Sequence, residues 1–206
     1  MTAARTLLAL VALLAGAAGY AQSVPTDARS GADPRLRDLL IEVIASLDSF
    51  EDRFAEVCPD VEILETQHRE TVEALRGISE ERAGFRYAPE KWSIREVVGH
   101  LLDTERVMAY RALRIARGDT TPLAGFEENS YVEAAGFDAR PLPDLVAEFG
   151  LVRTATLALL RGFDEVAFQR RGTASGWPVS VRALAFIIAG HERHHAGLLR
   201  ERYGLG

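Results

Sequence analysis

Residues 181–199 read VRALAFIIAGHERHHAGLL and carry the clearest helical pattern of the chain. The spacing of the apolar residues predicts an amphipathic helix with one buried face. His191 and His195 are four residues apart, so they lie one turn apart on that face. Both fall in the centre of the apolar stripe, which is formed by Val181, Leu184, Ile187, Ile188, Leu198 and Leu199.

Two imidazoles on a buried face need polar partners. Each unpaired group would cost about 1–3 kcal/mol in an apolar environment. A divalent metal ion satisfies both rings at once, whereas the alternative is a pair of core histidines bonded to backbone or water. The spacing of His191 and His195 favours the metal.

The same residues match the His-Glu-x-x-His motif, which marks zinc proteases with the glutamate as general base. That interpretation needs a third ligand downstream. The longer protease pattern requires glycine where Leu198 stands and histidine where Glu201 stands. A third histidine must therefore come from upstream. Glu192, at the edge of the stripe, is expected to support the fold or orient a ligand rather than act as the base.

The rest of the chain shows four further helical patterns, and no strand pattern competes with them. Ser93 and Glu96 predict a capping box at the start of one helix, which Gly118 ends. Thr156 is interpreted as the one polar residue on the inward face of the helix after Pro141. The polar connections are expected at 79–92, 119–140 and 163–180, and the connection 119–140 is long enough to form a pocket wall. The fold class is therefore all-α, a bundle of five helical segments. They are expected at about 34–57, at about 61–78, from the cap Ser93 to the stop at Gly118, after Pro141 and Pro143 through Leu160, and from Val181 through the two histidines to Leu199.

His100 is the best upstream candidate for the third ligand. It lies on the flank of its helix's apolar stripe, about 60° off the edge. Asp103, one turn further on, is expected to orient a ligand or a bound water, or else to be a solvated acid. His68 and Arg111 are weaker pocket candidates. A core histidine and an ordinary solvated or ion-paired arginine are their alternatives.

Composition excludes some functions. The 206 residues carry a net charge of −6 without a basic block, so nucleic-acid binding is disfavoured. Cys58 is the single cysteine, which excludes an intrachain disulfide and a four-thiolate metal site.

The N-terminus has the three regions of a secretory signal peptide. Residues 1–21 form this segment, 22–33 a disordered spacer, 34–57 an additional helix and 58–206 the metal-binding bundle. Export to the periplasm or beyond is expected, with no stable membrane insertion after cleavage. An uncleaved anchor is one alternative, and a cytoplasmic protein with a mis-assigned start codon is another.

Two motifs resemble a known family. WSIREVVGHLLD at 92–103 and GHERHHAG at 190–197 look like the second-helix and fourth-helix motifs of the DinB/YfiT-like metalloproteins. YAPEKW at 87–92 and RGT at 171–173 extend the likeness, which covers about residues 64–203. It implies a four-helix bundle with an additional N-terminal helix. It also implies that His100, His191 and His195 hold one divalent ion, which could be Zn, Ni, Mn or Fe.

The resemblance also implies a function. Members of the family include thiol S-transferases for bacillithiol or mycothiol, a thiol-dependent isomerase and proteins taken to be hydrolases. We therefore expect a metal-dependent enzyme that activates a low-molecular-weight thiol for S-transfer to a small molecule, with a homodimer as one possible assembly. Hydrolysis by a metal-bound hydroxide is the first alternative, and a non-catalytic metal-binding module is the second.

Overall fold

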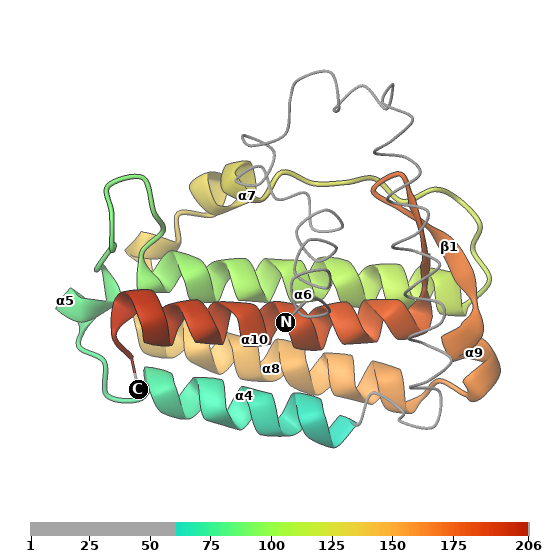
Figure 1. Cartoon of the computed structure of the whole chain (residues 1–206), viewed down its shortest axis with the longest axis horizontal. Helices are drawn as coiled ribbons and strands as arrows, with labels where there is room; N and C mark the ends of the chain where they lie inside the picture. The colour runs from blue at the N-terminus through green and yellow to red at the C-terminus, as the bar shows by residue number, and fades with distance from the viewer. Residues whose placement is uncertain (1–60, 206) are drawn as a thin grey trace.

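Four long helices form the body of the protein (Figure 1). The computed structural model describes residues 61–205. Each long helix contacts two others, in the cyclic order α4, α8, α6, α10. Their bounds are α4 Val61–Leu75, α6 Ile94–Ala116, α8 Leu142–Arg161 and α10 Val181–Tyr203. The predicted all-α four-helix bundle is confirmed. The signal-like segment, the spacer and the additional helix at 34–57 lie outside the described residues and stay predictions.

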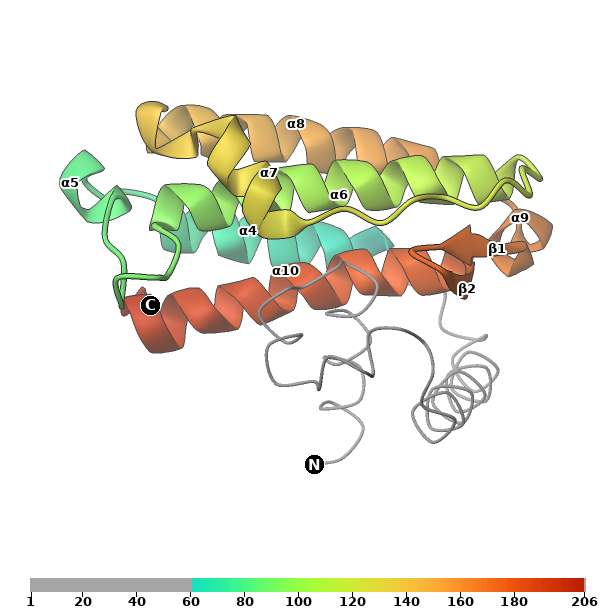
Figure 2. The ribbon, with the colours of Figure 1, turned by 90° about the horizontal axis from the view of Figure 1, so that it is seen from above.

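The helices α6 and α8 are neighbours that run in the same direction (Figures 1 and 2). A short turn cannot join two parallel helices, so the chain between them must return along the bundle. This crossover carries α7 (Glu128–Ala135) and the 3-10 helix η2 (Phe137–Ala139), where a loop was predicted. It packs closely on α6 because Gly99 has no side chain. A Cβ at Gly99 would lie 2.2 Å from the ring of Phe137.

A β-hairpin precedes α10, although no strand was predicted. After the short helix α9 (Glu165–Gln169), the strands β1 (Arg171–Ala174) and β2 (Trp177–Ser180) pair antiparallel, from Arg171 opposite Ser180 to Ala174 opposite Trp177. Ser175 and Gly176 form the turn with φ of 53° and 83°, as tight hairpin turns require. The strands of four residues each are too short to show alternation in the sequence.

Local capping sets where the helices begin. Ser93 accepts a hydrogen bond from the backbone N–H of Glu96, and the Glu96 carboxylate accepts one from the backbone N–H of Ser93, so the predicted capping box is confirmed. The Ser180 hydroxyl caps α10 by accepting a hydrogen bond from the backbone N–H of Ala183, and Ser79 caps the short helix α5 (Glu80–Ala83) by accepting one from the backbone N–H of Arg82.

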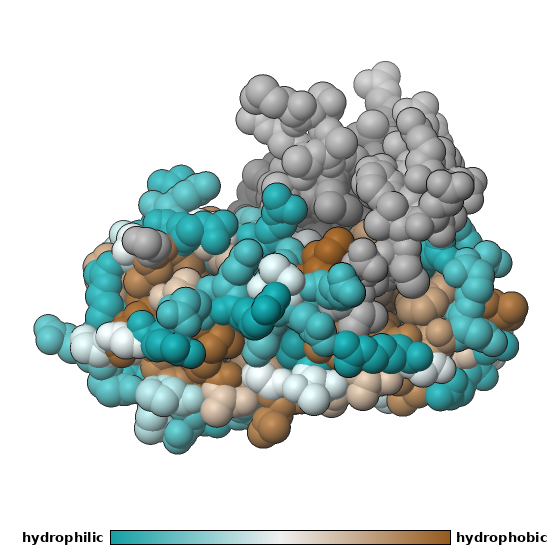
Figure 3. All heavy atoms as spheres, turned by 90° about the horizontal axis from the view of Figure 1, so that it is seen from below, coloured by the Kyte–Doolittle hydropathy of each residue, from teal (hydrophilic) through white to brown (hydrophobic). Residues whose placement is uncertain are grey.

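The surface is mixed in character. Figure 3 shows polar and apolar side chains sharing the face that it displays. This is the surface expected from helices that each bury one stripe. Among residues 61–205, no helix is both long and apolar enough to cross a membrane.

Candidate metal centre

Three histidines from two neighbouring helices meet inside the bundle. His100 lies in the second turn of α6, while His191 and His195 lie in the middle of the antiparallel helix α10. One ring nitrogen from each can be chosen so that all three lie within 4.8 Å of one another. The Nε2 atoms of His100 and His191 are 2.9 Å apart. The structure thus brings together the three ligands predicted from the sequence.

The three rings are buried, with exposed fractions of 3% for His100, 5% for His191 and 8% for His195. His100 is therefore a core residue, and its predicted place on the flank of the apolar stripe was wrong. The Trp92 ring packs against it at 4.6 Å between centroids and stacks on His195 at 6.4 Å. Trp92 closes the site at the end where the chain enters α6.

The donor set suits a cation. Burial lowers the pKa of His100, His191 and His195 well below the usual value, which favours the neutral imidazole that binds metals. Only one proton can be shared between the facing nitrogens of His100 and His191. The buried Nδ1 of His195 has no hydrogen-bond partner among residues 61–205. These residues therefore fit a divalent metal ion, which would satisfy lone pairs that the protein leaves poorly paired.

The crossover adds a carboxylate that the sequence analysis missed. Glu128, at the start of α7, places Oε2 3.9 Å from Nε2 of His100. Burial, with a smaller contribution from Glu127, raises the pKa of Glu128 to about 7. On the other side of the ring, Thr104 lies 3.4 Å from Nδ1 of His100 and orients it. A pocket wall was expected from this connection, but nothing in the local sequence singled out Glu128.

Glu192 belongs to a buried ion-pair network. It lies 2.8 Å from Arg153 of α8, and the same guanidinium binds both carboxylate oxygens of Glu105 on α6 at 2.8 and 2.7 Å. Burial raises the pKa of Glu192, while Arg153 and Thr71 act in the opposite direction. Arg153 is 1% exposed, so the prediction that Thr156 is the one polar residue on the inward face of α8 was wrong.

The remaining predicted residues have other partners. Asp103 pairs with Arg106 at 3.5 Å, and burial raises its pKa. His68 packs edge-on against Phe149 of α8 at 4.8 Å and is not one of the three clustered histidines. Arg111 bonds the crossover and the hairpin at the other end of α6, so the structure does not bring it to the triad either.

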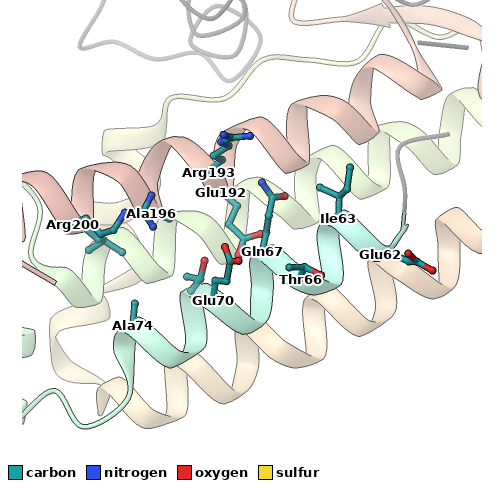
Figure 4. A pocket seen from close by; sticks show the side chains of 12 residues that line it. Glu62, Ile63, Thr66, Gln67, Glu70, Ala74, Glu192, Arg193, Ala196 and Arg200 are labelled. Atoms are coloured by element: carbon teal, nitrogen blue, oxygen red, sulfur yellow. The ribbon is translucent and has the colours of Figure 1, made fainter. Parts of the chain in front are cut away.

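A groove separates α4 from α10 on the outside of the bundle (Figure 4). Its volume is about 510 Å³, and Arg193 and Arg200 line it on the α10 side opposite Glu62 and Glu70 of α4. Figure 4 shows the Glu192 side chain directed from α10 toward α4. Glu192 therefore lies between the groove and the interior of the bundle.

Comparison with known proteins agrees with this architecture. The chain is similar to a protein of Geobacillus thermodenitrificans named "Putative metal-dependent hydrolase", with 32% identity over 151 residues that cover 66% of this chain and 82% of that protein.

Two solved structures share the fold. YfiT from Bacillus subtilis, described as "a probable metal-dependent hydrolase with an unusual four-helix bundle topology", matches with a TM-score of 0.63 at 18% identity, over 71% of this chain and 86% of YfiT. A mycothiol-dependent maleylpyruvate isomerase matches with a TM-score of 0.59 at 13% identity, over 70% of this chain and 61% of the isomerase. The family model of the DinB superfamily matches residues 63–199, and the chain belongs to this superfamily.

Proposed function

We propose that the protein is a metal-dependent enzyme that activates a small nucleophile, a low-molecular-weight thiol, for S-transfer. The observation that carries the proposal is the convergence of His100, His191 and His195 within 4.8 Å, with the carboxylate of Glu128 beside them. A three-histidine site leaves coordination positions for a substrate. A divalent ion held there would lower the pKa of a bound thiol or water.

The chain's own residues supply the other parts of the reaction. Glu128 Oε2 faces the triad from α7 and is placed to accept the proton that the nucleophile loses. Burial raises the pKa of Glu128 to about 7 in the metal-free protein, and a bound cation would lower it, so that the carboxylate would be ionised and able to accept a proton near neutral pH. Thr104 holds the His100 ring in place, and Trp92 covers His100 and His195 and excludes water from that side.

Hydrolysis is the second candidate function, with water in place of the thiol. The name of the Geobacillus relative favours it, whereas the fold shared with a mycothiol-dependent isomerase favours the thiol. Glu128 would accept a proton in either reaction.

The test uses the full chain loaded with one divalent metal at a time. Its metal content is measured first. Consumption of cysteine-based thiols is then followed with a bromobimane electrophile, and ester hydrolysis with p-nitrophenyl acetate in the absence of thiol. Metal-dependent thiol consumption that is lost in His191→Ala supports the proposal. Ester turnover without thiol, lost in the same variant, supports hydrolysis instead. Stoichiometric metal with neither activity would indicate a non-catalytic module and overturn the proposal.

A further inference from the structure

The Glu105–Arg153–Glu192 network has a charge imbalance. All three side chains are buried, with exposed fractions of 5% for Glu105 and 1% for Arg153 and Glu192. Two carboxylates share one guanidinium, so the network carries one excess negative charge when both carboxylates are ionised. A buried charge without a counter-charge costs folding free energy. The stability of the fold therefore does not explain why a second carboxylate binds Arg153.

The excess charge lies beside the triad. Glu192 follows His191 in the chain, and both line a small internal void of about 10 Å³ together with Glu105 and Thr104. The void has room for about one water molecule, and Leu101, Met108 and Ile188 complete its lining. The buried Oε1 atom of Glu192 makes no hydrogen bond to residues 61–205, and Thr71 is a polar side chain beside the Glu192 carboxylate.

We propose that Glu192, held by Arg153, is a positioning residue that stabilises the divalent cation bound at the histidine triad. Glu105, which binds the same arginine, contributes to this stabilisation. The three histidines are neutral ligands and supply no negative charge. The buried carboxylates of Glu105 and Glu192, which are not part of the cluster of three histidines, supply it. This inference rests on the metal site of the proposed function.

The proposal predicts different effects of Glu192→Gln on the stability of the metal-free fold and on the affinity for the cation. Glu192→Gln keeps the size of the side chain and an oxygen that can accept from Arg153, but it removes the excess charge. Without metal, the variant should unfold at the same urea concentration as the wild type or at a higher one, because the remaining Arg153–Glu105 pair is neutral. Its affinity for the cation should fall by about 10–100-fold, the range typical of residues that support metal ligands.

The measurement is Zn²⁺ affinity of the chelator-stripped full chain, by competition with a chromophoric chelator, combined with urea unfolding of the metal-free protein. Glu148→Gln is the matched control, since this α8 acid pairs with Arg106 and Arg140 at the surface. It should leave Zn²⁺ affinity unchanged. Glu105→Gln is a second test and should weaken Zn²⁺ binding in the same direction, which covers the case of a Glu192 variant that fails to fold.

The outcomes distinguish a role of Glu192 in metal binding from a role in the fold alone. Zn²⁺ affinity within about threefold of wild type, together with a lower urea midpoint, would show that Glu192 only supports the fold and would overturn the inference. If the wild type binds Zn²⁺ no better than His191→Ala, the metal site and the proposed function fail as well. Weakened binding in Glu192→Gln and Glu105→Gln, but not in Glu148→Gln, supports the inference.

Discussion

Two buried arginines, Arg153 and Arg111, bind different kinds of partner with their guanidinium groups. Arg153 is 1% exposed and lies in the network with Glu192, and Arg111 is 2% exposed and lies at the hairpin end of the bundle. Arg153 binds two carboxylates and the carbonyl oxygen of Leu64. Arg111 donates to the carbonyl oxygen of Ala124 and the hydroxyl of Ser175, both of which are neutral acceptors.

The pKa values follow these partners. The carboxylates raise the pKa of Arg153 despite its burial, whereas burial lowers the pKa of Arg111. Acidic side chains are thus concentrated where a cation is expected. At the other end of α6, Arg111 of this helix bonds the crossover and the hairpin turn. We infer that Arg153 serves the site and that Arg111 serves the fold, and this contrast can be tested.

The largest effect is expected from Arg153→Met, which leaves Glu105 and Glu192 buried without their counter-charge. Breaking a buried ion pair from one side typically costs about 3–5 kcal/mol of unfolding free energy. Urea unfolding of the metal-free variant measures it. The triple variant that adds Glu105→Gln and Glu192→Gln should recover part of the loss. A loss below about 1 kcal/mol in Arg153→Met would mean that the network matters little to the fold.

The second-largest effect is expected from removal of the metal, which should change the melting temperature. A ligand that binds only the folded state at about 1,000 times its Kd stabilises it by about 4 kcal/mol. Chelation should therefore lower the melting temperature of the wild type and hardly affect a His191→Ala, His195→Ala double variant. Differential scanning fluorimetry with and without chelator gives the comparison. Equal sensitivity of the two proteins would place the metal elsewhere.

The sequence predicted the parts of the site that depend on local spacing. His191 and His195 share a helix face whatever the rest of the fold does, and Ser93 with Glu96 predicts its own capping box. The predicted end of α4 at Ile78 was three residues beyond the observed Leu75. His100 was found from its place on a neighbouring helix and from the family resemblance.

The missed residues depend on tertiary structure. Arg153 is buried because Glu105 and Glu192, 48 and 39 residues away in the chain, meet it inside the bundle. An isolated helical pattern gives no reason to place an arginine in the core. Glu128 reaches the triad only because the crossover returns along α6. Spacing within one segment cannot predict such a path.

Arg111→Met should have a smaller effect than Arg153→Met. The variant loses the bonds to the Ala124 carbonyl oxygen and the Ser175 hydroxyl, and losing a buried hydrogen-bond donor costs about 1–3 kcal/mol. Zn²⁺ affinity should stay at the wild-type value, because Arg111 lies at the other end of α6 from the triad. The measurements are urea unfolding and chelator competition on the same preparation. A tenfold loss of Zn²⁺ affinity would remove the distinction between the two arginines.

The smallest effect is expected from an arginine–acid pair at the surface, where both side chains are only half-buried. Arg114 and Thr121 bond Asp119 after the end of α6 and lower the pKa of its carboxyl to about 2. Because the folded-state pKa lies below the usual value, the ionised carboxylate stabilises the fold above about pH 4, and this contribution is lost as the pH falls toward 2. Asp119→Asn should therefore lower the urea midpoint slightly at pH 6, and the difference from wild type should shrink at pH 3. A difference that stays constant between these pH values would show that the hydrogen-bond geometry of Asp119, rather than its charge, stabilises this end of the bundle.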